Sequence, residues 1–243
     1  MIRRTALFRG VRLGVVDPEP LRRFYLESLA LPEVATERTG FAVQVGETTL
    51  EFSPATGSAG GGAPHHFAFN IPRDRLEAAR DWLSERIELL PNPDGGHVFP
   101  FPDWDAQALY ALDPGGNIVE WIARHALSNE AGESSAGDES AAAEFGPEQM
   151  LEVSEVGVVT GNVPVYTATL RAGLGLRGYR PASPDFAPIG DERGLFIIAE
   201  QGRPWFPTET PAAPAPVEVR IDAAGREKRR FAPAGGMLRV RLD

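Results

Sequence analysis

The 243-residue chain contains no cysteine. It can therefore form no disulfide bond, and it offers no thiolate as a metal ligand or as a catalytic nucleophile. Any metal site must use histidine, carboxylate, carbonyl or water ligands, which suit divalent Fe, Mn, Ni, Zn or Mg. The chain also lacks any run of 18 apolar residues, so we expect no transmembrane helix and no membrane partner.

The chain also lacks an excess of positive charge, since 24 Lys and Arg residues stand against 34 Asp and Glu residues, the net charge is -10 and the pI is about 5.0. Non-specific nucleic-acid binding needs a cationic face, so nucleic acid is not expected as a partner. Arginines interrupt the apolar residues of the N-terminal stretch "MIRRTALFRGVRLGVV", which argues against a signal peptide. We therefore expect a cytoplasmic protein, and its 42% of hydrophobic residues is enough for a sizeable core.

The sequence does contain an internal repeat. Its pattern predicts a strand in "ALFRGVRLGVV", a helix in "DPEPLRRFYLESLAL" and strands in "FAVQV" and "TTLEFSP". The order begins again with a strand in "HHFAFNI", a helix in "RDRLEAARDWLSER" and strands in "AQALYALD" and "GNIVEWIAR", the last two joined by the turn "DPGGN". Residues 6–125 thus hold two copies of one β-α-β-β-β unit.

The rest of the chain is predicted to hold a linker and a weaker pair of units. Residues 126–149 are small, polar and acidic, as is typical of a linker. After them, "LEVSEVGVVTGNVPVYTATLRAGLGL" repeats a strand and a helix, but no helix fits between the last strands, "VEVRID" and "MLRVRL". We predict a first domain over 1–125, a linker over 126–149 and a degenerate second domain over 150–243.

Three stretches carry a resemblance to a known family: "VVDPEPLRRFYLESLAL", "HHFAFNIP" and "DPGGNIVEWI". They resemble the vicinal oxygen chelate superfamily, the group of glyoxalases, bleomycin-resistance proteins and extradiol dioxygenases. The resemblance implies an α+β fold in which paired βαβββ units form curved, mainly antiparallel sheets around a cup. The second pair of units would be degenerate.

In that family the metal ligands come from the first, fourth, fifth and eighth strands, which the resemblance places at Gly10, Glu51, His66 and Glu120. Strand alternation independently directs Glu51, His66 and Glu120 into a cup. These three are the candidate metal ligands, for Fe, Mn, Ni or Zn, and Glu120 and Glu51 are the candidate catalytic carboxylates. Because glycine has no side-chain donor at position 10, we expect weak metal binding and low occupancy.

Four residues are expected to line the cup as substrate contacts: Arg12, Asn70, Trp104 and Tyr110. The guanidinium of Arg12 could pair with Glu51 or Glu120 and replace the charge of a metal ion. His65 is expected on the opposite face, exposed or bonded to a loop. In the second half of the chain, the same alignment places the family's ligand positions at Glu155, at Ile197 and in the strand "VEVRID", which has no histidine. We expect no metal there, and a role in covering the cup or in a subunit contact, as in a homodimer.

Three functions remain open from the sequence. The first is an enzyme acting on a small-molecule ligand through a divalent ion: a lyase, an isomerase or an extradiol-type ring-cleavage dioxygenase. The missing histidine at position 10 favours glyoxalase-like or binding roles over the dioxygenase. The second is a metal-free protein of the same fold that sequesters a small molecule, and the third is a structural or regulatory remnant. Taken alone, His66 is more often an ordinary strand histidine.

Overall fold

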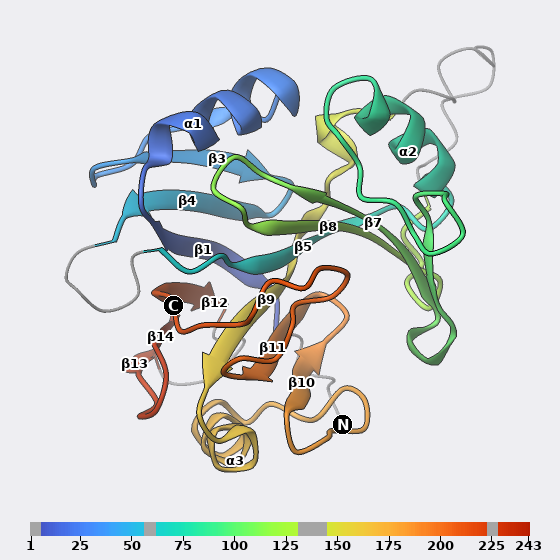
Figure 1. The fold of residues 1–243 in the computed structure, drawn as a ribbon. Helices are drawn as coiled ribbons and strands as arrows, with labels where there is room; N and C mark the ends of the chain where they lie inside the picture. Colours follow the sequence, from blue (N-terminus) through green and yellow to red (C-terminus); the bar gives the residue numbers. More distant parts are fainter. Residues whose placement is uncertain (1–5, 56–61, 131–144, 223–227) are drawn as a thin grey trace.

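The computed structural model describes residues 6–55, 62–130, 145–222 and 228–243, which form four units in two seven-stranded sheets (Figure 1). The first unit has β1 (Phe8–Val15), α1 (Pro18–Arg23), a π-helical turn (Phe24–Ser28), β2 (Glu33–Val34), β3 (Phe41–Val45) and β4 (Thr48–Pro54). The second has β5 (His66–Ile71), α2 (Leu76–Ser84), β6 (Phe99–Phe101), a 3-10 turn (Pro102–Trp104), β7 (Ala106–Leu112) and β8 (Ile118–Arg124).

The second half of the chain is shorter. A 3-10 turn (Pro147–Gln149) precedes the third unit, which has β9 (Glu152–Thr160), α3 (Val163–Leu174), β10 (Phe186–Asp191) and β11 (Gly194–Glu200). The fourth has β12 (Val217–Ile221), β13 (Arg229–Phe231) and β14 (Leu238–Leu242), with no helix among its described residues. The predicted α+β class with a degenerate second pair of units is confirmed.

Local sequence explains where the first helix begins and how the second repeat turns. Asp17 caps α1 by accepting a hydrogen bond from the Glu19 backbone amide at 3.0 Å, as expected of an N-cap. In the "DPGGN" turn, the carboxylate of Asp113 accepts bonds from the backbone amides of Gly115 and Asn117. The hydroxyl of Tyr25 donates to the same carboxylate at 2.8 Å. The turn therefore anchors the first unit to the second.

The units pair differently from the expectation. One sheet has the order β13-β14-β12-β1-β4-β3-β2, and the other has the order β10-β11-β9-β5-β8-β7-β6. The first unit thus joins the fourth and the second joins the third, through the antiparallel pairs β1–β12 and β5–β9. The expectation that the first two units share one cup is wrong, because each first strand uses its free edge to pair with a unit from beyond the linker.

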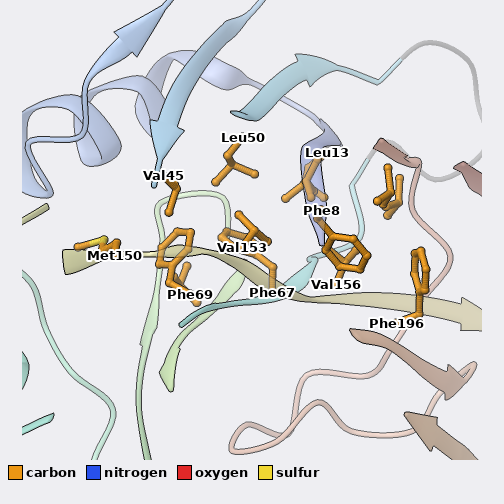
Figure 2. Close-up of a cluster of buried hydrophobic side chains, with 14 of the residues drawn as sticks. Phe8, Leu13, Val45, Leu50, Phe67, Phe69, Met150, Val153, Val156 and Phe196 are labelled. Atoms are coloured by element: carbon orange, nitrogen blue, oxygen red, sulfur yellow. The ribbon is translucent and has the colours of Figure 1, made fainter. Parts of the chain in front are cut away.

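The core lies between the two sheets and also includes the buried faces of α1, α2 and α3. Figure 2 shows Leu13 and Leu50 of one sheet facing Phe67, Val153 and Val156 of the other. The predicted apolar faces of the strands are all buried there: Val11, Leu13, Val15, Leu50, Phe52, Phe67, Phe69, Ile71, Val119, Trp121 and Ala123. The polar faces of both sheets therefore point away from this shared core, and each forms its own cup.

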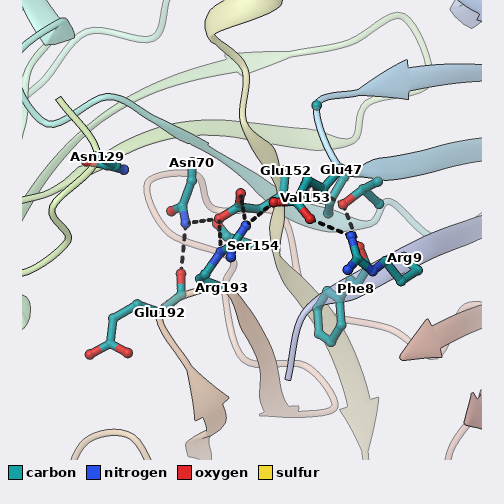
Figure 3. A network of polar contacts seen from close by, with 12 residues as sticks. Phe8, Arg9, Glu47, Asn70, Asn129, Glu152, Val153, Ser154, Glu192 and Arg193 are labelled. Carbon is teal, nitrogen blue, oxygen red and sulfur yellow. Dashed lines mark hydrogen bonds and ion pairs between the residues drawn. The ribbon is translucent and has the colours of Figure 1, made fainter. Parts of the chain in front are cut away.

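A network of ion pairs also joins the sheets (Figure 3). Arg193, in the turn between β10 and β11, pairs with Glu47, in the turn between β3 and β4 of the first sheet, at 2.7 Å and with Glu152 of the second sheet at 3.2 Å. None of the helices in the described ranges is long and apolar enough to cross a membrane.

Candidate functional site

Three buried ionisable side chains converge on the outer face of the second sheet. His66 on β5, Glu120 on β8 and Glu155 on β9 each offer one ligand atom, and these atoms lie within 4.8 Å of one another. The Nε2 atom of His66 lies 3.0 Å from Oε2 of Glu120. All three residues line a cavity of about 260 Å³. We call this cavity the second-sheet pocket.

The strand register explains why these residues meet. Ala68 of β5 is paired with Glu120 on one side and with Glu155 on the other. Directly paired residues project from the same face of a sheet, so the two carboxylates flank Ala68. The small methyl group of Ala68 does not fill the space between them. His66 precedes Ala68 by two residues and therefore projects from the same face.

A buried arginine compensates part of the negative charge. Arg124, at the end of β8, forms an ion pair with Glu155, and its Nε donates to Oδ1 of Asn70 at 3.2 Å. Burial, followed by the repulsion of Glu120, raises the pKa of Glu155, while Arg124 and His66 oppose that shift. With both carboxylates ionised and His66 neutral, the cluster keeps one net negative charge, which is costly to bury without a further cation.

Tyr110 of β7 lies on the other side of Glu120, to which it is directly paired across the strands. Burial, and then the charges of Glu120 and Glu155, raises the pKa of Tyr110 well above its usual value of 10.0. The phenol therefore stays protonated at neutral pH. A protonated phenol can donate a hydrogen bond to a neighbouring carboxylate or to a bound ligand.

The walls of the second-sheet pocket are aromatic. Trp205 stacks on the imidazole of His66, with ring centroids 5.4 Å apart, and its buried indole nitrogen has no partner among the described residues. Phe206 packs edge-on against Tyr110 at 5.7 Å. The remaining wall residues are Phe101, Trp104, Ile122, Phe186, Ile197 and Arg203. Such a pocket suits a flat, largely apolar molecule whose polar atoms reach the floor.

No family model matches the chain, and no curated protein matches its sequence. Solved structures do match over its whole length. An unconfirmed dioxygenase from Bacillus subtilis subsp. subtilis str. 168 has a TM-score of 0.61 at 14% identity, over 100% of this chain and 86% of that chain. Glyoxalase I from Zea mays has a TM-score of 0.51 at 14% identity, over 98% of this chain and 92% of that chain, and a mutant of it has 0.53 at 13%.

The chain has the vicinal oxygen chelate fold. The fold that the resemblance of its motifs implies is thereby confirmed. Sequence identities of 13–14% support no conclusion beyond the fold. In this example of the fold, the structure brings His66 and Glu120 together on neighbouring strands, as the alternation predicts, and Trp104 and Tyr110 line the same pocket.

Asn70 does not line the second-sheet pocket. Its amide nitrogen donates to Glu152 at 2.7 Å and to the backbone oxygen of Glu192 at 2.9 Å, within the network of Figure 3. Its role is to hold Arg124 through its Oδ1. His65 is not exposed either: it is buried, and its Nε2 bonds the backbone oxygen of Gly14 on β1 at 2.8 Å.

Glu51 and Arg12 lie in a different cup of the vicinal oxygen chelate fold. Glu51 is on β4 of the first sheet, so the prediction that it joins His66 and Glu120 is wrong. It instead binds Arg12, whose Nε lies 2.8 Å from Glu51 Oε1. Gly10 lines that same cup. The error follows from the pairing of units, since β1 and β4 belong to one sheet and β5 and β8 to the other.

The sequence offered an incomplete signal for the rest of the site. Registration of the third repeat places Glu155 at a ligand position, but the expected pairing of units kept it away from His66. Nothing local in the irregular stretch around Trp205 and Phe206 shows that it covers this pocket. Arg124 likewise looks like an ordinary basic residue at the end of a strand.

The residues of the second-sheet pocket fit a divalent ion. Imidazole nitrogen and carboxylate oxygens are ligands for Zn, Mn, Ni and Fe, and the three donor atoms, which lie within 4.8 Å of one another, would need to move closer only slightly to bind one ion together. His66 Nδ1 is buried and has no partner among the described residues. Arg124 competes with the ion for Glu155.

Proposed function

We propose that this protein is a glyoxalase-like lyase or isomerase that holds a divalent ion through His66, Glu120 and Glu155. The observation that carries the proposal is the convergence of three buried donors, two of them carboxyl groups, on the floor of an aromatic pocket. The substrate would be a small molecule with two neighbouring oxygen atoms and an apolar or aromatic body. A volume of about 260 Å³ limits it to a compact ligand.

The protein's own groups would bind the substrate and move one proton. A divalent ion, when bound, supplies Lewis-acid polarisation of a substrate oxygen. Glu120 would accept a proton from the carbon next to a carbonyl group and return it to the carbonyl carbon, since its carboxylate lies in the pocket between His66 and Tyr110. Tyr110 would donate a hydrogen bond to a substrate oxygen, and Trp205 with Phe206 would shield that step from water.

The donor set favours proton transfer over oxygen chemistry. Non-haem Fe(II) oxygenases typically use two histidines and one carboxylate, whereas this pocket offers one histidine and two carboxylates. An extradiol-type dioxygenase is therefore the less favoured activity.

Metal-free binding of a small molecule is the second candidate function, because the acidic side chains of the pocket already have basic side chains as partners. Arg124 pairs with Glu155, and a protonated His66 would pair with Glu120. In that state the floor would be neutral without a metal ion, and the aromatic walls would supply most of the affinity.

Metal analysis of protein purified without chelator, followed by titration with Mn, Ni, Zn and Fe(II), separates these functions. The enzyme proposal expects one ion per chain and a loss of affinity of more than about tenfold in His66→Ala and Glu120→Gln. His97→Ala is a matched control, because His97 lies outside the pocket and bonds the Leu90 backbone. Equal metal affinity in all four proteins would contradict the proposed site and favour the metal-free function.

A further inference from the structure

The outer face of the first sheet carries a second, larger cup of about 950 Å³. We call it the first-sheet cup; strands of the first and fourth units form it (Figure 1). Its charged lining consists of Arg12, Arg38, Arg220, Arg230, Arg239 and Arg241 with Glu37, Glu51 and Glu218. Six arginines against three glutamates leave three positive charges, in a chain whose net charge is -10.

The floor of the first-sheet cup already holds a cation of its own. Arg12 lies 2.8 Å from Glu51 through Nε and 2.5 Å from Glu218 through Nη1. A guanidinium paired on both sides occupies the space between the two carboxylates, so a metal ion would have to displace it. Glu218 also pairs with Arg239, whereas Arg220, Arg230 and Arg241 have no ion pair with the floor among the described residues.

Three of these arginines form a row across neighbouring strands. Arg220 of β12 is paired with Arg241 of β14, and Arg241 is paired with Arg230 of β13. Like charges directly opposite each other destabilise a sheet. Asp243 pairs with both Arg220 and Arg241, whereas the guanidinium of Arg230 has no ion-pair partner among the described residues. The row has more positive charge than its own neighbours neutralise.

Gly10 makes room for this row. It is paired with Arg220 on the neighbouring strand, and a Cβ atom at position 10 would lie 3.2 Å from the Nε and Nη2 atoms of Arg220. Arg38, between β2 and β3 of the first unit, also lines the cup, whereas the three arginines of the row belong to the fourth unit. Planar guanidinium groups bind phosphate and carboxylate groups through paired hydrogen bonds.

We propose that the first-sheet cup binds a small molecule that carries two or more phosphate or carboxylate groups. The row of Arg220, Arg241 and Arg230 contacts the anionic groups, and the anion removes the repulsion between them. The volume of the cup accommodates a larger ligand than the second-sheet pocket does. This site is independent of the proposed metal centre, because it lies on the other sheet.

Calorimetric titration with sodium pyrophosphate, sodium triphosphate and citrate tests the proposal, in buffer of low and of physiological ionic strength. We expect saturable binding of one anion per chain. If pyrophosphate or triphosphate binds more tightly than citrate, the ligand carries phosphate groups; if citrate binds more tightly, the ligand carries carboxylate groups. The double variant Arg220→Gln with Arg241→Gln weakens binding about tenfold, and Arg230→Gln also weakens it. The matched control for Arg230→Gln is Arg23→Gln, which removes one positive charge from an exposed position at the end of α1.

A second readout guards against variants that alter folding. Without anion, Arg230→Gln raises the melting temperature, because it removes a like-charged neighbour of Arg241. A lower melting temperature would mean that Arg230 has a structural role and would overturn its assignment to the ligand. No saturable binding of any of the three anions, or equal binding in all variants and the control, would overturn the proposal. Metal affinity of the second-sheet pocket stays unchanged throughout.

Discussion

Arg12 in the first-sheet cup occupies the position that Ala68 occupies in the second-sheet pocket. Arg12 is paired with Glu51 and Glu218 on its two sides, and Ala68 is paired in the same manner with Glu120 and Glu155. The residue two positions earlier is Gly10 in one case and His66 in the other. Two cups with equivalent carboxylates thus differ in their built-in cation: Arg12 lies between both carboxylates of the first-sheet cup, whereas Arg124 pairs with Glu155 in the second-sheet pocket.

The first prediction is that Gly10→His with Arg12→Ala creates a second metal site. The exchange reproduces His66 and Ala68 next to Glu51 and Glu218, so the double variant should bind one more divalent ion per chain than the wild type. Metal titration followed by calorimetry measures this. Gly10→His alone is the control and should bind no extra ion, because the guanidinium of Arg12 stays between the carboxylates. Equal stoichiometry in the double variant and the wild type would refute the equivalence.

The second prediction concerns Arg124. Arg124→Met leaves Glu155 buried beside Glu120 without its ion-pair partner, which should destabilise the metal-free protein by roughly 3 kcal/mol. A divalent ion should restore more stability to this variant than to the wild type, because it replaces the missing positive charge. Denaturant unfolding with and without Mn or Zn measures both effects. A variant that metal does not restore would support the metal-free function instead.

The third prediction is a pH dependence caused by His65. Burial lowers its pKa from 6.5 to about 4, so the unfolded chain binds a proton more readily than the folded chain between these values. The stability that neutral His65 supports is complete above pH 6.5 and falls as the pH drops toward 4, by roughly 3 kcal/mol in all. Urea unfolding across this range, with a chelator present, should show the loss in the wild type and a smaller one in His65→Gln. Parallel profiles for the two proteins would rule His65 out as the cause.

The fourth prediction concerns the linker. Limited proteolysis should cut first within 126–149, which is the segment richest in small, polar and acidic residues. The two fragments should stay together under native conditions, because each sheet contains strands from both sides of the cut. Size-exclusion chromatography of the cleaved protein checks this. Separation of the fragments without denaturant would mean that the halves behave as the independent domains over 1–125 and 150–243 that the composition predicts.

The sequence by itself determined the units and the faces of their strands. Alternation in "HHFAFNI" and "GNIVEWIAR" is a local property, since successive side chains of a strand point to opposite faces, and it placed His66 and Glu120 correctly on one polar face. The same reasoning directed Glu51 and Arg12 to a polar face, where they bind each other. The cap at Asp17 and the "DPGGN" turn were equally readable from neighbouring residues.

Only the tertiary structure decided which units share a sheet. Every first strand has a free edge that offers the same backbone donors and acceptors to any partner, so alternation and repeat spacing do not distinguish one pairing from another. The choice comes from long-range packing between the two sheets, and it joined β5 with β9 and β1 with β12. That choice added Glu155 to the site of His66, because β9 lies in the same sheet as β5. It excluded Glu51 from that site, because β4 lies in the other sheet.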